Sequence, residues 1–142
     1  PSEESWKLAG ERAQELPFPV EFIGLPGEQI PLDDKSVDTV LCTFSLCTIP
    51  DPVKALEGMK RVLKPGGKLV FCEHGAAPDS DVARWQDRIN PVWKVLFGGC
   101  NLNRKMPSLI EEGGFRIADL QTMYLPSTPR LAGFNYWGVA QA

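Results

Sequence analysis

"VDTVLCTFSLCTIPDPVKALEGMKRVLKPGGKLVFCEHG", residues 37–75, decides the predicted fold. It begins with an apolar run rich in β-branched residues, which is typical of a strand covered on both faces. Asp51 and Pro52 predict a helix start, an N-cap carboxylate followed by proline at the first helical position. Apolar residues then recur at spacings of three and four as far as Leu63. A second apolar strand ends at His74, so we expect a βαβ unit with parallel strands and a right-handed crossover.

The turn "PGG" at residues 65–67 separates this helix from the second strand. Proline cannot continue a helix, and glycine readily adopts the positive φ that a chain reversal requires. We therefore assign Gly66 and Gly67 a structural role, as a helix stop and a reversal.

The segments on either side extend the α/β pattern. Before residue 37 we expect a helix over 2–16, a short strand over 18–24 and a loop as far as Ser36. After residue 75 we expect a helical stretch over 79–97 broken at Pro91, a short helix closed by Gly113 and Gly114, and two late strands, 116–125 and 134–142, forming an antiparallel hairpin at the sheet edge.

The size, charge and cysteine spacing of the chain exclude several classes of protein function. The chain has 142 residues, the size of a single domain, 1–142. Its 15 basic and 18 acidic residues leave no electrostatic footprint for nucleic acid. No apolar run has the length of a membrane span. The four cysteines show no C-x-x-C pair, so no metal ligand set is predicted, and free cysteines favour a reducing, cytoplasmic location.

The carboxyl ends of the predicted strands are the place to look for a site. In an open α/β sheet, ligands bind in the crevice outside the carboxyl ends of the parallel strands. Three segments should reach that edge, at residues 24–28, 43–47 and 73–75. We expect all three to converge on one crevice.

The order of these pieces, with the motifs "LKPGG", "LCTIPDP", "PGGKLVFCEH", "NPVWK" and "GGCNLNR", resembles the class I S-adenosylmethionine-dependent methyltransferases. The later motifs resemble, more narrowly, bacterial relatives of the methyltransferase-like thiol methyltransferases of endoplasmic reticulum and lipid droplets. The resemblance covers the whole chain. It implies a Rossmann-like three-layer sandwich, with a mostly parallel sheet and an antiparallel C-terminal strand. The chain would be the C-terminal portion of such a domain, missing the first two strands and the Gly-rich loop that follows the first.

The same resemblance implies S-adenosylmethionine as cofactor and assigns residues to its adenosine end. Ser2 should lie near the ribose, and Trp6 should pack by the adenine. Gly27 and Glu28 match the residues after the third strand whose backbone meets the adenine edge. Pro26 stands where the family has an aspartate that accepts from the adenine amino group, so that contact departs from the family pattern.

The resemblance assigns a second group of residues to the methionine and sulfonium end of the cofactor. Thr43, Phe44 and Cys47 match the positions after the fourth strand that line it. His74, at the tip of the fifth strand, stands where the methyl acceptor would enter. An imidazole that titrates near neutrality can take a thiol proton, so His74 is the candidate catalytic residue. The competing interpretation is that His74 donates to a backbone carbonyl and only closes the strand.

Other polar and aromatic residues near this edge have two interpretations each. Glu73 either contacts substrate or caps a structural element. Cys100 either lines the acceptor pocket or is a buried structural cysteine. The aromatic side chains of the predicted 79–97 helix either cover an apolar acceptor or belong to the core. They are Trp85, Trp93 and Phe97. Arg104 and Lys105 are predicted to form a solvated face.

Three functions follow, in order of preference. The first is methyl transfer from S-adenosylmethionine to a small apolar acceptor such as a thiol. The second is a non-catalytic methyltransferase fragment whose unpaired sheet edge drives self-association, as a homodimer, or pairing with a complementing N-terminal segment. The third, a dinucleotide dehydrogenase, is disfavoured because the chain carries no phosphate-binding glycine fingerprint.

Overall fold

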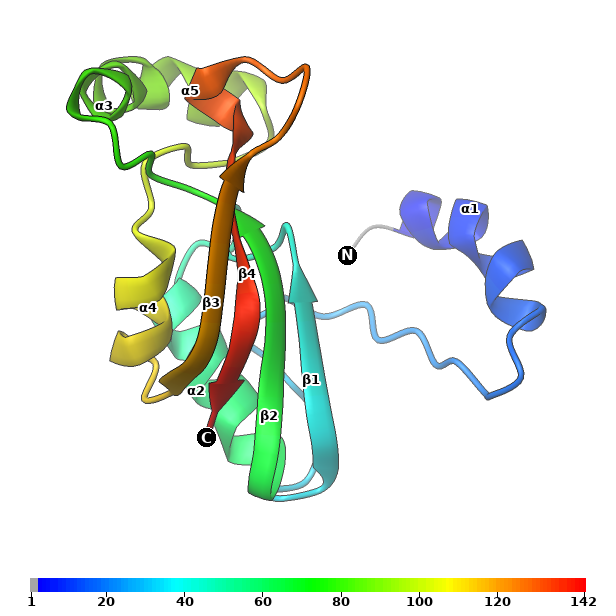
Figure 1. Ribbon diagram of the computed structural model, residues 1–142. Coiled ribbons are helices and arrows are strands. Elements are labelled where there is room, and N and C mark those ends of the chain that lie inside the picture. The colour runs from blue at the N-terminus through cyan, green and yellow to red at the C-terminus, as the bar shows by residue number, and fades with distance from the viewer. Residues whose placement is uncertain (1–2) are drawn as a thin grey trace.

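The computed structural model describes residues 3–142 and contains one four-stranded sheet. Its strand order is β1-β2-β4-β3 (Figure 1). The strands are β1 (Val37–Thr43), β2 (Leu63–His74), β3 (Arg116–Tyr124) and β4 (Phe134–Gln141). β1 and β2 pair in parallel, whereas β4 is antiparallel to both of its neighbours. The expected α/β class and the antiparallel C-terminal strand are confirmed.

Five helices accompany the sheet in the described residues: α1 (Glu3–Gln14), α2 (Pro52–Val62), α3 (Ser80–Leu96), α4 (Met106–Glu112) and α5 (Arg130–Gly133). α2 and α4 cover one face of the sheet, and α3 and α5 lie beyond the carboxyl ends of β1 and β2 (Figure 1). α1 lies apart from the sheet. Among the described residues, no helix combines the length and the apolar composition that crossing a bilayer requires.

The βαβ unit forms as its sequence predicts. The Asp51 carboxylate accepts from the Lys54 backbone N–H at 3.0 Å and so caps α2, with Pro52 at the first helical position. The apolar stripe of α2 packs Leu56 and Met59 into the core against Phe71 of β2. Each such side chain contributes about 1.5–3 kcal/mol when buried, so this stripe fixes the helix on the sheet.

The turn at residues 65–67 needs its two glycines for different reasons. Gly66 has a φ of +81°, as the predicted reversal requires. Gly67 does not have a positive φ; a Cβ there would lie 2.9 Å from the Lys64 carbonyl oxygen and 3.1 Å from that of Asp38. The prediction of a positive φ at both positions is therefore wrong for Gly67, which instead permits a close backbone approach. α2 ends at Val62, and β2 already includes this turn.

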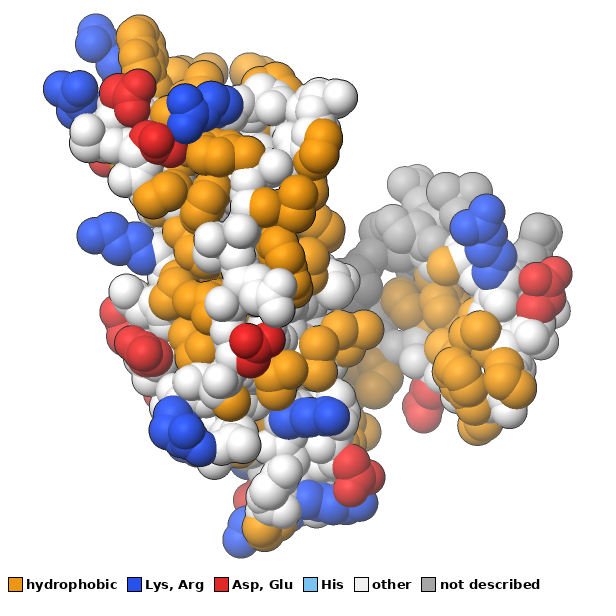
Figure 2. Space-filling view, in the orientation of Figure 1, with side chains coloured by type: hydrophobic (Ala, Val, Ile, Leu, Met, Phe, Trp, Pro, Cys, Tyr) orange, Lys and Arg blue, Asp and Glu red, His pale blue; other side chains and the backbone are white. Residues whose placement is uncertain are grey.

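The strand predicted over residues 18–24 does not form, so that prediction is wrong. A strand is stable only when a neighbour satisfies its backbone hydrogen bonds, and the described sheet offers no strand to this segment. β1 is consequently an edge strand and is not covered on both faces: the Leu41 side chain is 70% exposed. Figure 2 shows hydrophobic side chains gathered over the strands on this uncovered sheet face.

Of two predictions for the C-terminal half, the break in the helix at Pro91 is wrong and the antiparallel hairpin is confirmed. α3 runs without a break through Pro91, contrary to the predicted interruption. Pro91 and Asp87, four residues before it, are both exposed, so solvent can satisfy the carbonyl that proline leaves without a donor. The late antiparallel hairpin is confirmed, with β3 at the sheet edge, β4 inside the sheet and α5 in the connection.

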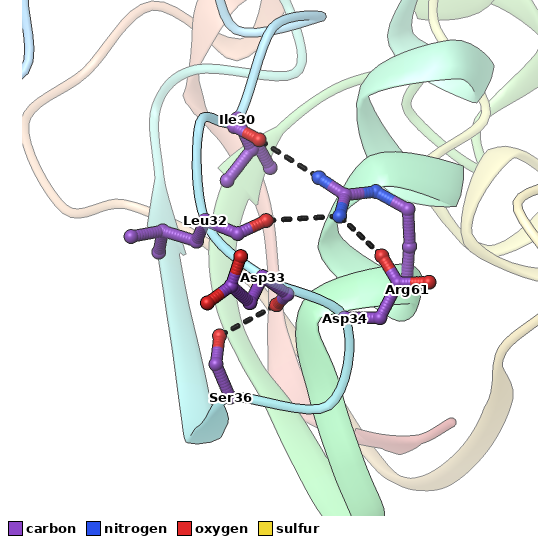
Figure 3. A network of polar contacts seen from close by, with 6 residues as sticks. All are labelled: Ile30, Leu32, Asp33, Asp34, Ser36 and Arg61. Carbon is purple, nitrogen blue, oxygen red and sulfur yellow. Dashed lines mark hydrogen bonds and ion pairs between the residues drawn. The ribbon is translucent and has the colours of Figure 1, made fainter.

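Arg61 of α2 anchors the segment that leads into β1 (Figure 3). Its guanidinium donates to the carbonyl oxygens of Ile30 and Leu32 at 2.8 and 2.9 Å and pairs with the Asp34 carboxylate at 2.5 Å. The planar fork of arginine can reach several acceptors at once, which a lysine ammonium cannot do in the same geometry. Arg61 thus ties residues 30–34 to the helix without any strand pairing.

We expect Arg61→Lys to lower the free energy of unfolding by about 1 kcal/mol, because this half-exposed site loses part of its carbonyl contacts. Urea denaturation measures the change. The matched control is Arg84→Lys, on the exposed surface of α3, where one hydrogen bond to the Ser80 carbonyl is at stake. Equal effects from the two substitutions would contradict the anchoring role of Arg61.

Candidate active site

Two segments of the chain meet at the carboxyl ends of β1 and β2. Residues 44–50 follow β1, and residues 98–104 follow α3. The Asn101 backbone N–H and side-chain amide both donate to the Cys47 carbonyl oxygen, at 2.8 and 3.0 Å. The Phe44 N–H donates to the Cys72 carbonyl oxygen at 2.9 Å, which joins the first segment to β2. These contacts build a compact edge from parts of the chain that are far apart in sequence.

Glu73 holds the loop after β1 from inside. Its side chain is fully buried, and its Oε1 accepts from the backbone N–H groups of Ser45 at 2.7 Å and Leu46 at 3.1 Å. The Cys42 thiol lies 3.5 Å from the same oxygen. Burial raises the pKa of the Glu73 carboxyl, an effect that the amide donors partly offset. Glu73 is therefore the structural cap of this loop, in agreement with the second interpretation given to it.

Arg104 holds the same loop from the other side. Its Nη1 donates to the carbonyl oxygens of Leu46 and Ile49, the latter at 2.7 Å. The side chain is half-buried, and this desolvation lowers its pKa. The prediction that Arg104 belongs to a solvated face is wrong. Nothing in the local sequence "NLNRK" indicates that this arginine folds back onto a loop more than fifty residues earlier.

Gly75 permits the strand tip to approach the 98–104 segment. Its N–H donates to the Phe134 carbonyl oxygen at 3.1 Å. A Cβ at this position would clash with the Arg104 carbonyl oxygen and lie 3.1 Å from the Met106 side chain. The glycine after Glu73 and His74 is thus required by packing.

Cys47, His74 and Cys100 bring their side chains together at this edge. The sulfur and ring nitrogen atoms of the three residues all lie within 4.8 Å of one another. Cys100 Sγ is 3.2 Å from His74 Nε2. Cys47 is buried, whereas His74 and Cys100 are half-buried. His74 therefore contacts a thiol here, and Cys100 is half-buried at this edge and not fully buried.

Burial disfavours the charged forms of Cys47 and His74. It raises the pKa of the Cys47 thiol to about 11, with a smaller opposing contribution from the Thr48 hydroxyl at 3.3 Å. It lowers the pKa of His74 below its usual value. The edge is thus a weakly polar surface on which a neutral imidazole can accept a proton.

Phe44 projects its ring over this surface from a strained backbone. Its φ is +45°, which is rare for a bulky residue and costs of order 1–3 kcal/mol. The ring is 53% exposed, and its centroid lies 6.4 Å from that of the His74 ring. The strain aims an aromatic face at the strand tips instead of into the core.

The residues predicted to meet the adenosine end lie elsewhere or are not described. Gly27 packs against Ile49, where a Cβ would come within 2.6 Å of Ile49 Cδ1. Glu28 Oε1 accepts from the Asp51 N–H at 3.1 Å. These two residues thus contact the far end of the loop after β1, at Ile49 and Asp51. Ser2 lies outside the described residues.

The aromatic residues predicted to lie near the cofactor or the acceptor are found in different parts of the structure. Trp6 of α1 stacks on Phe22, with ring centroids 5.0 Å apart, and α1 lies apart from the sheet (Figure 1). Trp93 and Phe97 stack on each other at 3.8 Å in the last turns of α3, just before Cys100. Trp85 is exposed on α3 beside Arg88. The Cys100 backbone N–H donates to the Phe97 carbonyl oxygen at 3.1 Å, so the Trp93–Phe97 pair adjoins the edge.

Comparison with known proteins places this architecture in context. A family model described as "Methyltransferase domain" matches residues 1–71. Thiol S-methyltransferase TMT1B of Rattus norvegicus is 39% identical over 119 residues, 79% of this chain and 49% of that protein. Thiol S-methyltransferase TMT1A of Homo sapiens is 36% identical over 121 residues, 84% of this chain and 50% of that protein. The chain thus spans about half the length of these curated relatives.

A solved structure shares the fold. A crystal structure of a SAM-dependent methyltransferase from Methanosarcina mazei superposes with a TM-score of 0.71 at 19% identity, covering 99% of this chain and 78% of the other. At that identity the likeness concerns the fold alone. It confirms the Rossmann-like class for the arrangement of strands and helices described above.

Glu73→Ala should lower the free energy of unfolding by about 2–4 kcal/mol, because two buried amide N–H groups lose their acceptor. Glu73→Gln keeps an acceptor oxygen in the same place and should cost less than about 1 kcal/mol. Chemical denaturation of both variants gives the two values. If Gln is as damaging as Ala, the carboxylate does not act as a cap.

Proposed function

The chain belongs to the methyltransferase domain family, within the class I S-adenosylmethionine-dependent methyltransferases. From that premise we propose that it takes part in transfer of the methyl group of S-adenosylmethionine to a small apolar acceptor, a thiol. The observation that carries the proposal is the convergence of Phe44, Cys47, His74 and Cys100 at the carboxyl edge of β1 and β2. The thiol acceptor is supported by the two relatives named as thiol S-methyltransferases.

The chemistry of this edge fits the sulfonium end of the cofactor. The exposed ring of Phe44 presents a π face, which attracts a cation such as a sulfonium. Burial raises the pKa of the Cys47 thiol and lowers the pKa of His74, so a neutral thiol and a neutral imidazole lie beside this ring and do not repel a positive charge. We propose that Thr43, Phe44 and Cys47 hold this end, and that Ser2, Gly27 and Glu28 contribute to the adenosine end. The bound cofactor would supply an electrophilic methyl group.

The residues of the chain would position the acceptor and remove its proton. A thiol that approaches the strand tip meets His74, whose neutral imidazole can accept the S–H proton. Transfer then forms a sulfur–carbon bond on the acceptor and breaks one on the sulfonium. The half-buried surroundings and the Trp93–Phe97 pair would limit water at this point. Such a displacement mainly requires that the nucleophile, the methyl carbon and the sulfonium sulfur lie in one line.

The proposal predicts selective methylation of thiols. When the purified chain is incubated with S-adenosylmethionine and an aliphatic thiol, mass spectrometry should detect the methyl thioether, and the matched alcohol should give no ether. His74→Ala should lower kcat/KM by about 100-fold or more, the usual contribution of a general base. Cys72→Ser, a half-buried β2 cysteine, should retain the activity.

Two results would contradict this function. One is the absence of thioether at saturating cofactor and thiol. The other is an unchanged rate for His74→Ala when circular dichroism shows that the variant is folded.

A second candidate is favoured by the free edge of β1. Its backbone faces no strand among the described residues, and Leu41 is 70% exposed. We propose that residues 1–142 form one domain, the C-terminal portion of a class I methyltransferase domain, and that a further strand completes this edge. A second copy of the chain, as a homodimer, or a complementing N-terminal segment would supply that strand. The four free cysteines suit a reducing, cytoplasmic location for either arrangement.

Light scattering tests the edge. For the homodimer we expect a mass above that of the monomer, and a dissociation constant that Leu41→Lys raises at least about 10-fold, since a charge on an edge strand opposes pairing. Val95→Lys is the matched control, because Val95 is 80% exposed on α3, away from β1. A monomer at all concentrations would reject self-association, as would equal effects of the two substitutions.

A further inference from the structure

We propose that Cys47, His74 and Cys100 form a zinc-binding site. Their three ligand atoms lie within 4.8 Å of one another. They come from the loop after β1, the tip of β2 and the loop after α3, three separate parts of the chain. This origin explains why the spacing of the cysteines along the sequence indicates no metal site: the ligands are neighbours only after folding.

The separations are close to those of a zinc centre. Zinc binds cysteine sulfur at about 2.3 Å and histidine nitrogen at about 2.0–2.1 Å, so ligand atoms at tetrahedral angles lie roughly 3.4–3.8 Å apart. Cys100 Sγ and His74 Nε2 are 3.2 Å apart, and the remaining pairs fall within 4.8 Å. Side-chain adjustments of a few tenths of an ångström to about 1 Å would bring the three atoms around one ion.

The backbone that carries the ligands is already held in place. The Cys47 carbonyl accepts two hydrogen bonds from Asn101, which fixes Cys47 relative to Cys100. Glu73 and Arg104 hold the remaining polar groups of the Cys47 loop. His74 ends a strand that is paired on both sides. A preorganised trio of this kind differs from a chance cluster of side chains on a surface.

The type and number of the ligands fit zinc and do not fit magnesium or calcium. Thiolates and imidazole suit zinc, whereas magnesium and calcium require oxygen ligands. Two cysteines and one histidine match the three-ligand pattern of zinc sites that keep their fourth position open. His74 and Cys100 are half-buried, so the open position would face the accessible side of the edge.

The open position gives the site a role that rests on the proposed function. A zinc ion held by Cys47, His74 and Cys100 would lower the pKa of an acceptor thiol at the open position, so that the thiol would lose its proton to solvent and act as a thiolate nucleophile. Its sulfur then forms the bond to the methyl carbon as the sulfonium carbon–sulfur bond breaks. In the zinc-bound chain His74 would be a ligand, and the ion would take over the deprotonation that His74 performs in the metal-free chain.

Metal titration of the reduced, metal-free chain tests the site directly. We expect one equivalent of zinc to bind by calorimetry, and one equivalent of cobalt(II) to give the thiolate-to-cobalt charge-transfer band of a tetrahedral site. Cys100→Ser and His74→Asn should each weaken zinc binding by at least about 100-fold, because loss of an outer-shell partner alone costs 10–100-fold. Cys72→Ser should bind zinc as the unaltered chain does.

Several outcomes would overturn the proposal. They are the absence of the charge-transfer band, a zinc affinity that Cys100→Ser and His74→Asn leave unchanged, and an equal loss in Cys72→Ser. A reduced chain that binds no zinc, and that forms a Cys47–Cys100 disulfide once an oxidant such as dissolved oxygen is supplied, would also overturn it. Cys100 and His74 are tested separately, so if one of the two variants does not fold, the zinc affinity of the other still tests the site. The titrations contain neither cofactor nor acceptor, so failure of zinc binding is distinguishable from failure of methyl transfer.

Discussion

The buried carboxylate of Glu73 is the constraint on which the rest of the site depends. It sits at the end of β2 and accepts from the backbone of Ser45 and Leu46, immediately after β1. Removing a carboxylate from water is costly, and the cost is recovered only if its donors stay in place. The loop after β1 therefore has one preferred shape. That shape sets Cys47 beside the tip of β2, where His74 points away from Glu73 because successive strand residues alternate.

Arg104 completes this arrangement from the opposite side. The Glu73 carboxylate accepts hydrogen bonds from backbone N–H groups of the loop. The Arg104 guanidinium donates to the carbonyl oxygens of Leu46 and Ile49. The loop thus has defined partners although it forms neither helix nor strand. A rigid loop at a strand edge can support strained or reactive side chains, and Phe44 with its positive φ is one of them. Asn101 ties the Cys47 carbonyl to the segment that carries Cys100, so the position of Cys100 beside His74 depends on the same loop.

Local signals in the sequence predicted much of the fold and part of the site. The Asp51 cap, the apolar spacing of α2 and the two apolar strands predict the βαβ unit, because each acts within a few residues. The segment 18–24 has a strand-like composition but forms no strand, since pairing depends on a neighbour and not on composition. Arg104 and the Cys47–His74–Cys100 trio depend on contacts between distant segments, which no periodicity in the chain encodes. The family resemblance located Cys47 and His74 by position, and only the fold places them side by side.

We propose that the carboxyl edge of β1 and β2 receives the methyl donor. Titration of the ¹⁵N-labelled chain with S-adenosylhomocysteine, followed by amide chemical shifts, tests it most directly. We expect saturable shifts concentrated at residues 43–48 and 73–75, with smaller changes near Cys100. Shifts confined to α1 and residues 15–36, or none at saturating ligand, would contradict the claim.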